Sequence, residues 1–423
     1  MSQMTTSKQS LYRRFLNFLP VITAGSPGAI RIVVLLVANH ILMPDEMAVF
    51  SSQFTLSSAF VMLCGIGTAT VLIKNIAADK KTFTRLLGSL VNVYTYGMLL
   101  AVIICVAASL AFHGENLAGM IALTVSLSGY QVARSYFIGI KNFIALFIAD
   151  VFLATLLLLS LVLILMTKAD TSTMVIVLVA ASYFIAQALM IASAFMLSRA
   201  AGEEIEKPVL VDREYYQSGT LIGLSNLFSS GISFILPSLF LVTAGNEIAV
   251  LASLAASFFS IIAVLPRGVV NNHLSSLAEQ IRKKSLDRAY MASIKRSLNR
   301  IIVLASPIAF IAVFSYAYLA DVIAKDYYKS FIFLLLLASN FVIAQLGVLE
   351  SNIIYFCKKE MLAFLMNMSA FLIVLVSYVI CLVFPGFALV DYFIFFVPSI
   401  LSMFFLVRWH VFRKHISHVF SSQ

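Results

Sequence analysis

Residues 16–42 read LNFLPVITAGSPGAIRIVVLLVANHIL, a run in which Arg31 carries the one full charge at neutral pH. About 20 apolar residues cross a bilayer as a helix, because each residue rises about 1.5 Å through a core about 30 Å thick. The run therefore predicts a transmembrane helix with a cation near its centre. It is too long for the apolar part of a cleavable signal peptide.

The whole chain, like this first run, is rich in apolar residues and poor in charged ones. Of its 423 residues, 61% are apolar and 11% are charged, against about 25% charged residues in an ordinary soluble domain. So few charged side chains cannot cover the exterior of a soluble protein of this length. The composition excludes a soluble enzyme and a disordered chain, and it predicts an integral membrane protein.

Twelve apolar segments have the length of a membrane span, and none alternates as the strands of a membrane β-barrel do. The sequence thus predicts an all-α polytopic protein. The first six segments are 16–42, 47–73, 86–112, 117–140, 143–166 and 174–197, and the second six are 219–243, 248–270, 301–324, 330–356, 361–384 and 390–412.

The distribution of basic residues predicts the orientation of the chain. If both termini lie on one side, nearly all of the 29 lysines and arginines fall in loops on that side, and the opposite loops hold Lys168, Lys325 and Lys329. Basic loops stay in the cytoplasm, so both termini are expected there. Anionic lipids of the inner leaflet then account for the net charge of +10, and no nucleic-acid partner is needed.

A charged stretch divides the segments into two sets of six. We expect residues 1–197 to form one helix bundle, 198–218 a cytoplasmic linker and 219–423 a second bundle. Residues 272–299 of the second half have apolar side chains at spacings of three and four among basic ones, which predicts an amphipathic helix on the inner leaflet.

Short matches between the halves support a repeat. Glu46-Met47-Ala48-Val49-Phe50 opens the second segment, and Glu247-Ile248-Ala249-Val250-Leu251 opens the eighth, at an offset of 201 residues. Six segments per half make the repeat parallel. The predicted shape is two bundles around a central cleft, related by an axis along the membrane normal.

The chain resembles the multidrug/oligosaccharidyl-lipid/polysaccharide (MOP) exporter superfamily, and specifically its bacterial O-antigen flippase branch. The resemblance covers the twelve segments, their six-plus-six division and the linker. The stretches that carry it are Glu46–Phe50 leading into Gly65-Ile66-Gly67-Thr68-Ala69 and Lys74-Asn75, and Arg134-Ser135-Tyr136-Phe137-Ile138-Gly139 followed by Asn142-Phe143.

This resemblance implies a flippase of the bacterial inner membrane that moves undecaprenyl-pyrophosphate-linked O-antigen or related repeat units by alternating access. The lipid-linked oligosaccharide is the implied partner, with a polysaccharide polymerase and chain-length proteins as further candidates. The transport unit is expected to be a monomer without a cofactor, and coupling to a proton or sodium gradient stays open.

Arg31 is the first candidate site residue. A charge within a span is costly, by about 2.5–3.5 kcal/mol or more, and needs a partner or a wet cavity. We interpret Arg31 as a substrate-binding cation for a pyrophosphate or an acidic sugar, because arginine binds such groups bidentately. The alternative is a structural ion pair with a carboxylate on a neighbouring helix.

Arg134 and Asp150 lie on the two arms of a hairpin that turns near Lys141, at nearly matching depths. A salt bridge between them is the simpler interpretation. In the other interpretation, protonation or ion binding at Asp150 frees Arg134 for substrate and couples transport to a gradient. Glu350 has the same two interpretations, as a proton-responsive switch or an interfacial carboxylate, and Arg267 is its expected partner.

The remaining candidates are uncharged. Gln53 and Asn226 lie within spans, where they are expected either to bind sugar hydroxyls or to hold helices together. Pro237 interrupts the seventh segment, as Pro27 does the first, so each position is a candidate hinge or a static kink.

Several motifs are absent from the sequence. It has no phosphate-binding loop of the Walker type and no cluster with metal-site spacing, so no metal and no nucleotide hydrolysis are expected. Two other functions compete with the flippase. A multidrug or cation antiporter of the same superfamily would need deep carboxylates, and a membrane-embedded O-antigen polymerase or ligase would need a large external loop. We expect no enzyme activity.

Overall fold

The computed structural model describes residues 2–76, 82–97, 117–167, 171–203, 213–283, 287–320, 327–357, 359–384 and 387–421, with single positions between 99 and 106 and at 322. All regular structure in these ranges is helical. Ten helices among the described residues are long and apolar enough to cross a membrane. The chain is therefore an all-α membrane protein.

Ten expected segments correspond to these helices. Eight of them fall on α1 (Ser2–Ile41), α7 (Phe143–Thr167), α8 (Ser172–Ala200), α11 (Asn246–Arg282), α12 (Arg288–Leu319), α13 (Tyr327–Leu346), α15 (Glu360–Val383) and α16 (Phe387–Ser421). The second is α2 (Pro44–Val61), η1 (Met62–Ile66) and α3 (Gly67–Ile76), and the seventh is α9 (Arg213–Asn226), η3 (Leu227–Gly231) and α10 (Ile232–Thr243).

The other two expected segments are less simple. The fourth forms the helix α6 (Leu117–Gly139), which carries Arg134 and is not among the ten apolar spans. The third begins as α4 (Thr82–Asn92) and η2 (Val93–Gly97), and most of its second half lies outside the described residues.

The tenth segment is broken at Gly347, so that α14 (Val348–Phe356) follows α13 as a separate helix.

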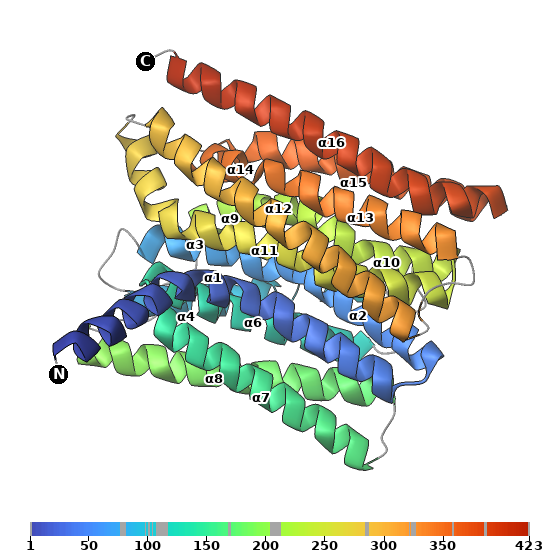
Figure 1. The fold of residues 1–423 in the computed structure, drawn as a ribbon, viewed down its shortest axis with the longest axis horizontal. Helices are drawn as coiled ribbons and strands as arrows, with labels where there is room; N and C mark the ends of the chain where they lie inside the picture. Colours follow the sequence, from blue (N-terminus) through green and yellow to red (C-terminus); the bar gives the residue numbers. More distant parts are fainter. Residues whose placement is uncertain are drawn as a thin grey trace.

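The helices form two groups that lie side by side (Figure 1), with α1 to α8 in one and α9 to α16 in the other. The start of α1 and the end of α16 lie at the same end of the bundle (Figure 1), which we call the terminal end. The opposite end, where α1 gives way to α2 and α10 to α11, is called the far end. Across the two groups, α1 contacts α11, α2 contacts α10 and α11, and α3 contacts α9.

At the far end, residues at equivalent positions of the two halves contact each other. Asn246 Nδ2 donates to Asp45 Oδ1 at 2.7 Å. These two residues are 201 positions apart, the same offset as the matching stretches that follow them. Residues at equivalent positions of a repeat meet where a twofold axis passes between them. A twofold axis that runs along the bundle between the two halves would produce this contact.

Residues 272–299 do not form one amphipathic helix on a membrane surface. α11 continues to Arg282, and α12 begins at Arg288 after an N-cap in which Asp287 Oδ1 accepts from the Ala289 N–H at 2.8 Å. Leu277, Ile294 and Leu298 are buried in a cluster with residues of α14 and α16. The apolar stripe seen in the sequence is therefore covered by protein, which is the physical reason for the difference.

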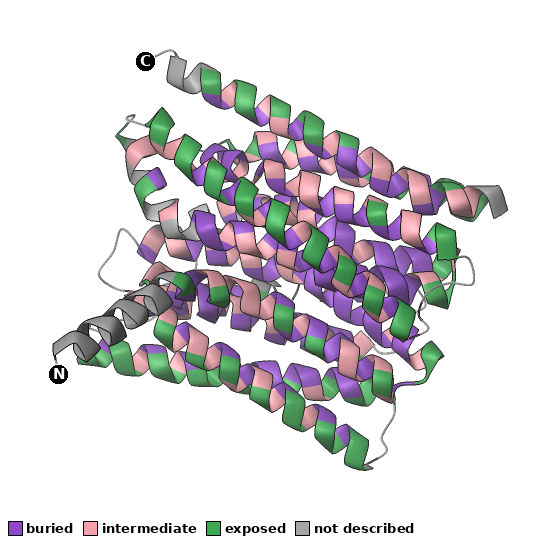
Figure 2. Cartoon of the chain, in the orientation of Figure 1, coloured by how far each residue is buried: buried purple, intermediate pink, exposed green. Residues whose placement is uncertain are grey.

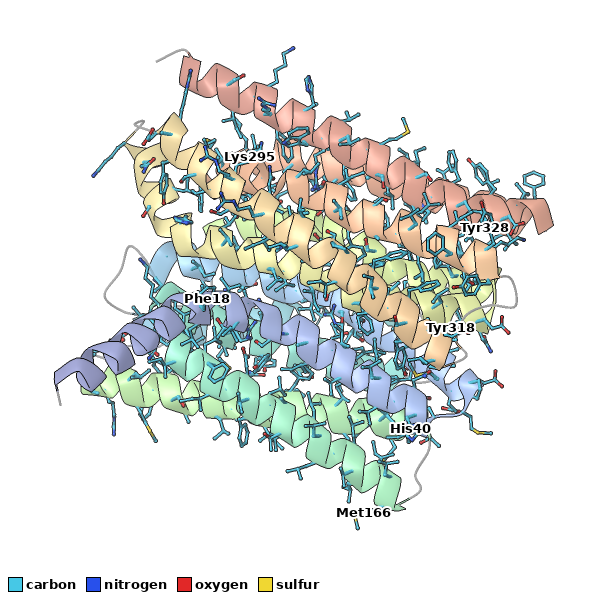
Figure 3. The ribbon with its side chains drawn as sticks, in the orientation of Figure 1. Phe18, His40, Met166, Lys295, Tyr318 and Tyr328 are labelled. Atoms are coloured by element: carbon cyan, nitrogen blue, oxygen red, sulfur yellow. The ribbon has the colours of Figure 1, made fainter. Side chains whose placement is uncertain are left out.

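The outer surface is apolar along its length. Burial is concentrated where the two groups meet, and α7, α12 and α16 turn many exposed residues outward (Figure 2). Tyr318 and Tyr328 are exposed toward the far end, and Lys295 lies at the terminal end (Figure 3). Exposed tyrosines at one end of an apolar belt are typical of a membrane interface.

Candidate functional site

A cavity of about 330 Å³ lies between the two helix groups, toward the terminal end. One wall comes from α3 and α6 together with the α6–α7 turn at Lys141, and the other from α9, η3, α11 and α13 to α16. Its polar lining residues are Thr70, Gln131, Ser135, Lys141, Asn226, Ser229, Ser230, Arg267, Gln345, Ser351, Asn352, Tyr355, Asn367 and Arg408.

The charged lining of this cavity is entirely basic. Lys141, Arg267 and Arg408 contribute to it, and no aspartate or glutamate is among the described residues that line it. The apolar lining residues and the bundle around them lower the local dielectric, so these cations attract an anion more strongly than they would in water. The cavity is suited to an anionic ligand.

Arg408 is held in place by an amide. Its Nη1 donates to Asn367 Oδ1 at 2.9 Å, and its Nη2 donates to the Ala344 carbonyl at 3.3 Å. Asn367 Nδ2 in turn donates to Ser225 Oγ at 2.8 Å. Arg408 Nε is buried and has no hydrogen-bond partner in the described part of the chain. Nη1 and Nη2 each carry a second N–H, which leaves the guanidinium donor capacity for a ligand.

Arg267 follows Pro266 on α11 and lines the cavity from the same wall as Arg408. Its Nη2 donates to Ser230 Oγ at 2.7 Å, a residue of η3. The π-helical turn η3 widens the helix locally, which is typical of functional positions. Asn226 precedes η3 and also lines the cavity, while its Nδ2 donates to the Ile222 carbonyl at 2.9 Å.

Arg134 and Asp150 form a buried salt bridge outside the cavity lining. Arg134 Nη2 lies 2.9 Å from Asp150 Oδ2, and Nε donates to Oδ1 at 3.0 Å. Tyr130 donates to the same carboxylate at 2.6 Å, and Ser26 of α1 also donates to it. The Thr23 carbonyl accepts from Arg134. The geometry is that of the simpler interpretation, a pair that joins α1, α6 and α7.

The expected pairing of Glu350 with Arg267 is wrong. Glu350 Oε1 instead accepts from Lys295 Nζ at 2.6 Å and from Trp409 Nε1 at 3.1 Å. The physical reason is that the break at Gly347 starts a separate helix, α14, which packs against α11 and α16. From there Glu350 reaches Lys295 of α12 and Trp409 of α16. Glu350 is not a lining residue of the cavity.

The other predicted residues also lie outside the cavity lining. Arg31 places its guanidinium 4.5 Å from the centre of the Phe234 ring on α10, and no carboxylate pairs with it in the described part of the chain. Gln53 is buried on α2, and its Oε1 has no hydrogen-bond partner among the residues that the structure describes. Pro237 is buried within α10, which continues through it as a helix.

Sequence reasoning missed Arg408. Arg408 lies near the C-terminal end of the twelfth apolar segment. A basic residue at that position usually marks the cytoplasmic end of a membrane span. That position alone did not separate it from its neighbours in the basic tail. A signal was present nonetheless, because Asn367 and Arg408 are both polar residues within predicted spans, and they meet in the structure.

Outside the spans, the extension of α11 brings His273 to α12, where its Nδ1 lies 2.7 Å from the Tyr290 hydroxyl. Burial lowers the pKa of His273. This contact ties the hairpin of α11 and α12 together beyond the bundle. No group of three or more metal-ligating side chains occurs among the residues that the structure describes.

Solved structures share this fold over nearly the whole chain. A MOP superfamily transporter from Pyrococcus furiosus aligns with a TM-score of 0.65 and 16% identity over 96% of both chains. A MATE protein in the straight conformation aligns with a TM-score of 0.60 and 16% identity over 96% of both chains. A multidrug resistance MATE family transporter in an outward-facing conformation aligns with a TM-score of 0.57 and 15% identity, covering 95% of this chain and 96% of the other.

The fold is therefore the MATE-like fold of MOP superfamily transporters. At these identities the likeness defines the fold and does not separate the branches of the superfamily. No protein-family model and no curated protein matches the sequence.

Proposed function

We propose that the protein is a transporter that flips a lipid-linked oligosaccharide, of the undecaprenyl-pyrophosphate O-antigen type, from the cytoplasmic to the periplasmic leaflet of a bacterial inner membrane. In this proposal the chain crosses the membrane twelve times, with both termini and the terminal end in the cytoplasm. The observation that carries the proposal is the cavity whose charged lining residues are Lys141, Arg267 and Arg408.

Charge complementarity supports an anionic substrate. A pyrophosphate presents oxygen acceptors that match the planar donor set of arginine, and Arg267 and Arg408 approach the cavity from different helices. The hydroxyl and amide side chains around them, among them Asn226 and Asn352, suit sugar hydroxyls. In this proposal the cavity of about 330 Å³ receives the pyrophosphate end of the head group, and the lipid tail stays outside it.

The Pyrococcus furiosus MOP transporter is described as having a binding pocket of reverse polarity that suggests a different function. A multidrug or cation antiporter remains the competing function. It would use a carboxylate in the cavity, whereas the described lining contains none and Asp150 is already paired with Arg134.

The test is to replace the two cavity arginines in a strain that depends on this protein for surface O-antigen. Arg267→Gln and Arg408→Gln should each lower surface O-antigen at least about tenfold, because removal of a charge-assisted hydrogen bond costs about 1.5–3 kcal/mol. Lipid-linked repeat units should accumulate on the cytoplasmic face. Membrane levels of each variant are measured by immunoblot.

Arg300→Gln is the matched control, because Arg300 is exposed and does not line the cavity. It should leave O-antigen display unchanged. Normal display by both cavity variants would contradict the flippase proposal. Lost drug resistance with normal glycan display would favour the antiporter instead.

A further inference from the structure

The inference concerns Asn367 of α15, the residue that holds the cavity arginine Arg408. Its Oδ1 accepts from Arg408 Nη1 at 2.9 Å, while its Nδ2 donates to the Ser225 carbonyl at 3.0 Å and to Ser225 Oγ at 2.8 Å. Ser225 Oγ in turn lies 2.9 Å from the Tyr355 hydroxyl. The amide of Asn367 therefore joins α16 to α9 and, through Ser225, to α14.

The guanidinium of Arg408 is also fixed by groups other than Asn367. Its Nη2 donates to the Ala344 carbonyl at 3.3 Å, and its Cζ lies 4.6 Å from the centre of the Phe405 ring. Arg408 is 6% exposed and Asn367 is 2% exposed. Each of these partners is neutral, and an arginine stays protonated at neutral pH. Arg408 thus presents an oriented positive charge that no described carboxylate cancels.

Arg134 is a reference for Arg408 within the same molecule. Arg134 is buried as well, but Asp150 of a neighbouring helix cancels its charge. Asparagine and aspartate have nearly the same size, so a carboxylate at position 367 would reach Arg408 as the amide does. A buried charge without a counter-charge is unfavourable. An amide in this position is therefore what a charge reserved for a ligand requires.

We propose that Asn367 is the residue that decides the charge preference of the cavity: its neutral amide orients Arg408 without cancelling its charge, so that the cavity accepts an anion. Asn367 is a positioning residue, because it acts through Arg408. The proposal rests on the proposed function, in which a pyrophosphate group binds at Arg408.

Asn367→Asp tests the role of the neutral amide. In this variant Arg408 should pair with the new carboxylate, as Arg134 pairs with Asp150. The affinity of the purified full-length protein for inorganic pyrophosphate should fall at least about tenfold, because a charge-assisted contact is lost. Isothermal titration calorimetry in detergent measures the affinity. The melting temperature should stay close to that of the wild type, because the new ion pair offsets the lost bond to the Ser225 carbonyl.

Asn340→Asp is the matched control. Asn340 is also 2% exposed, and its Nδ2 donates to the Pro398 carbonyl at 3.4 Å. It does not line the cavity, and no arginine or lysine pairs with it in the described part of the chain. A carboxylate there would be buried without a counter-charge, so the melting temperature should fall clearly. Pyrophosphate affinity should stay at the wild-type value.

Asn367→Ala tests whether the residue acts through Arg408. It leaves the arginine charged but without its main support, so pyrophosphate affinity should fall in the otherwise wild-type protein. In an Arg408→Gln background, Asn367→Ala should cause no further loss, because effects that pass through one shared group are not additive. A purely structural role would lower affinity equally in both backgrounds.

Three results would overturn the proposal: wild-type pyrophosphate affinity in Asn367→Asp, a fall in its melting temperature as large as that of Asn340→Asp, or an equal effect of Asn367→Ala in both backgrounds. None of them would decide the O-antigen test of Arg267 and Arg408. Conversely, normal O-antigen display by the two arginine variants would contradict the flippase and leave the pyrophosphate measurements on Asn367 intact.

Discussion

At the scale of single residues, the arginines within the bundle have different surroundings. Arg134 is fully paired, with Asp150 and the Thr23 carbonyl as acceptors. Arg267 and Arg408 face a cavity, and their hydrogen-bond partners among the described residues are neutral. Arg31 lies over an aromatic ring. Arg134 thus holds helices together through its ion pair with a carboxylate. The other three arginines are available to an anionic ligand.

The Arg134–Asp150 pair is predicted to stabilise the bundle. Asp150→Asn should lower the free energy of unfolding by about 3–5 kcal/mol, because it leaves a buried guanidinium without its counter-charge. Thermal unfolding of the purified protein in detergent measures the loss. Asp391→Asn is the control, since the Lys329–Asp391 pair is about half exposed on both sides and such pairs contribute about 0–1 kcal/mol.

Equal stability of the two variants would contradict a structural role for Asp150. Loss of transport in Asp150→Asn at wild-type stability would instead favour the coupling interpretation. The assay therefore distinguishes the two interpretations that the sequence left open.

At the scale of helices, glycines set how closely the two groups approach. A Cβ on Gly67 of α3 would lie 2.1 Å from the Gly219 carbonyl oxygen of α9, and a Cβ on Gly223 would lie 2.5 Å from the Leu63 carbonyl oxygen. These are backbone atoms, which cannot move aside as a flexible side chain does. Gly67 belongs to one of the stretches that carry the family resemblance, and close helix packing explains it there.

The helix contact between α3 and α9 predicts an asymmetry between two glycines that face each other. Gly67→Ala should destabilise the protein by about 1–3 kcal/mol through overpacking. Gly219→Ala should be tolerated, because the nearest atoms to its Cβ lie 3.8 Å away. Melting temperatures of the two variants in detergent test this, and equal melting temperatures would contradict the packing geometry.

At the scale of the whole molecule, the two ends of the interface are in different states. A cavity lies toward the terminal end, and at the far end the Ser52–Ser238 and Asp45–Asn246 contacts join the two groups. Under the proposed function, a cavity toward one end and contacts at the other correspond to one of the two states that alternating access requires.

The orientation of the whole molecule in the membrane can be tested at two exposed positions. Lys359 lies exposed at the terminal end and Met43 lies exposed in the far-end turn between α1 and α2. In intact spheroplasts, an impermeant thiol reagent should modify Met43→Cys and should reach Lys359→Cys only after the membrane is permeabilised. The reverse pattern would contradict the cytoplasmic placement of both termini and, with it, the direction of transport.

The sequence by itself determined the helical class, the position of most spans and the few charges within them, because hydropathy and charge are properties of each segment taken alone. Ten expected spans recur as apolar helices. Asn226 and Arg267 of the predicted site line the cavity. The sequence also placed Arg134 and Asp150 at matching depths on one hairpin, where they pair.

Tertiary structure decided which polar side chains share a surface. Glu350 bonds to Lys295 and Trp409 rather than to Arg267, Arg408 faces the cavity, and Arg31 rests on Phe234 in the other half. These outcomes depend on how each helix is rotated and on which distant helix lies against it. The side chains of the partner helix set that rotation, so no single segment contains the information.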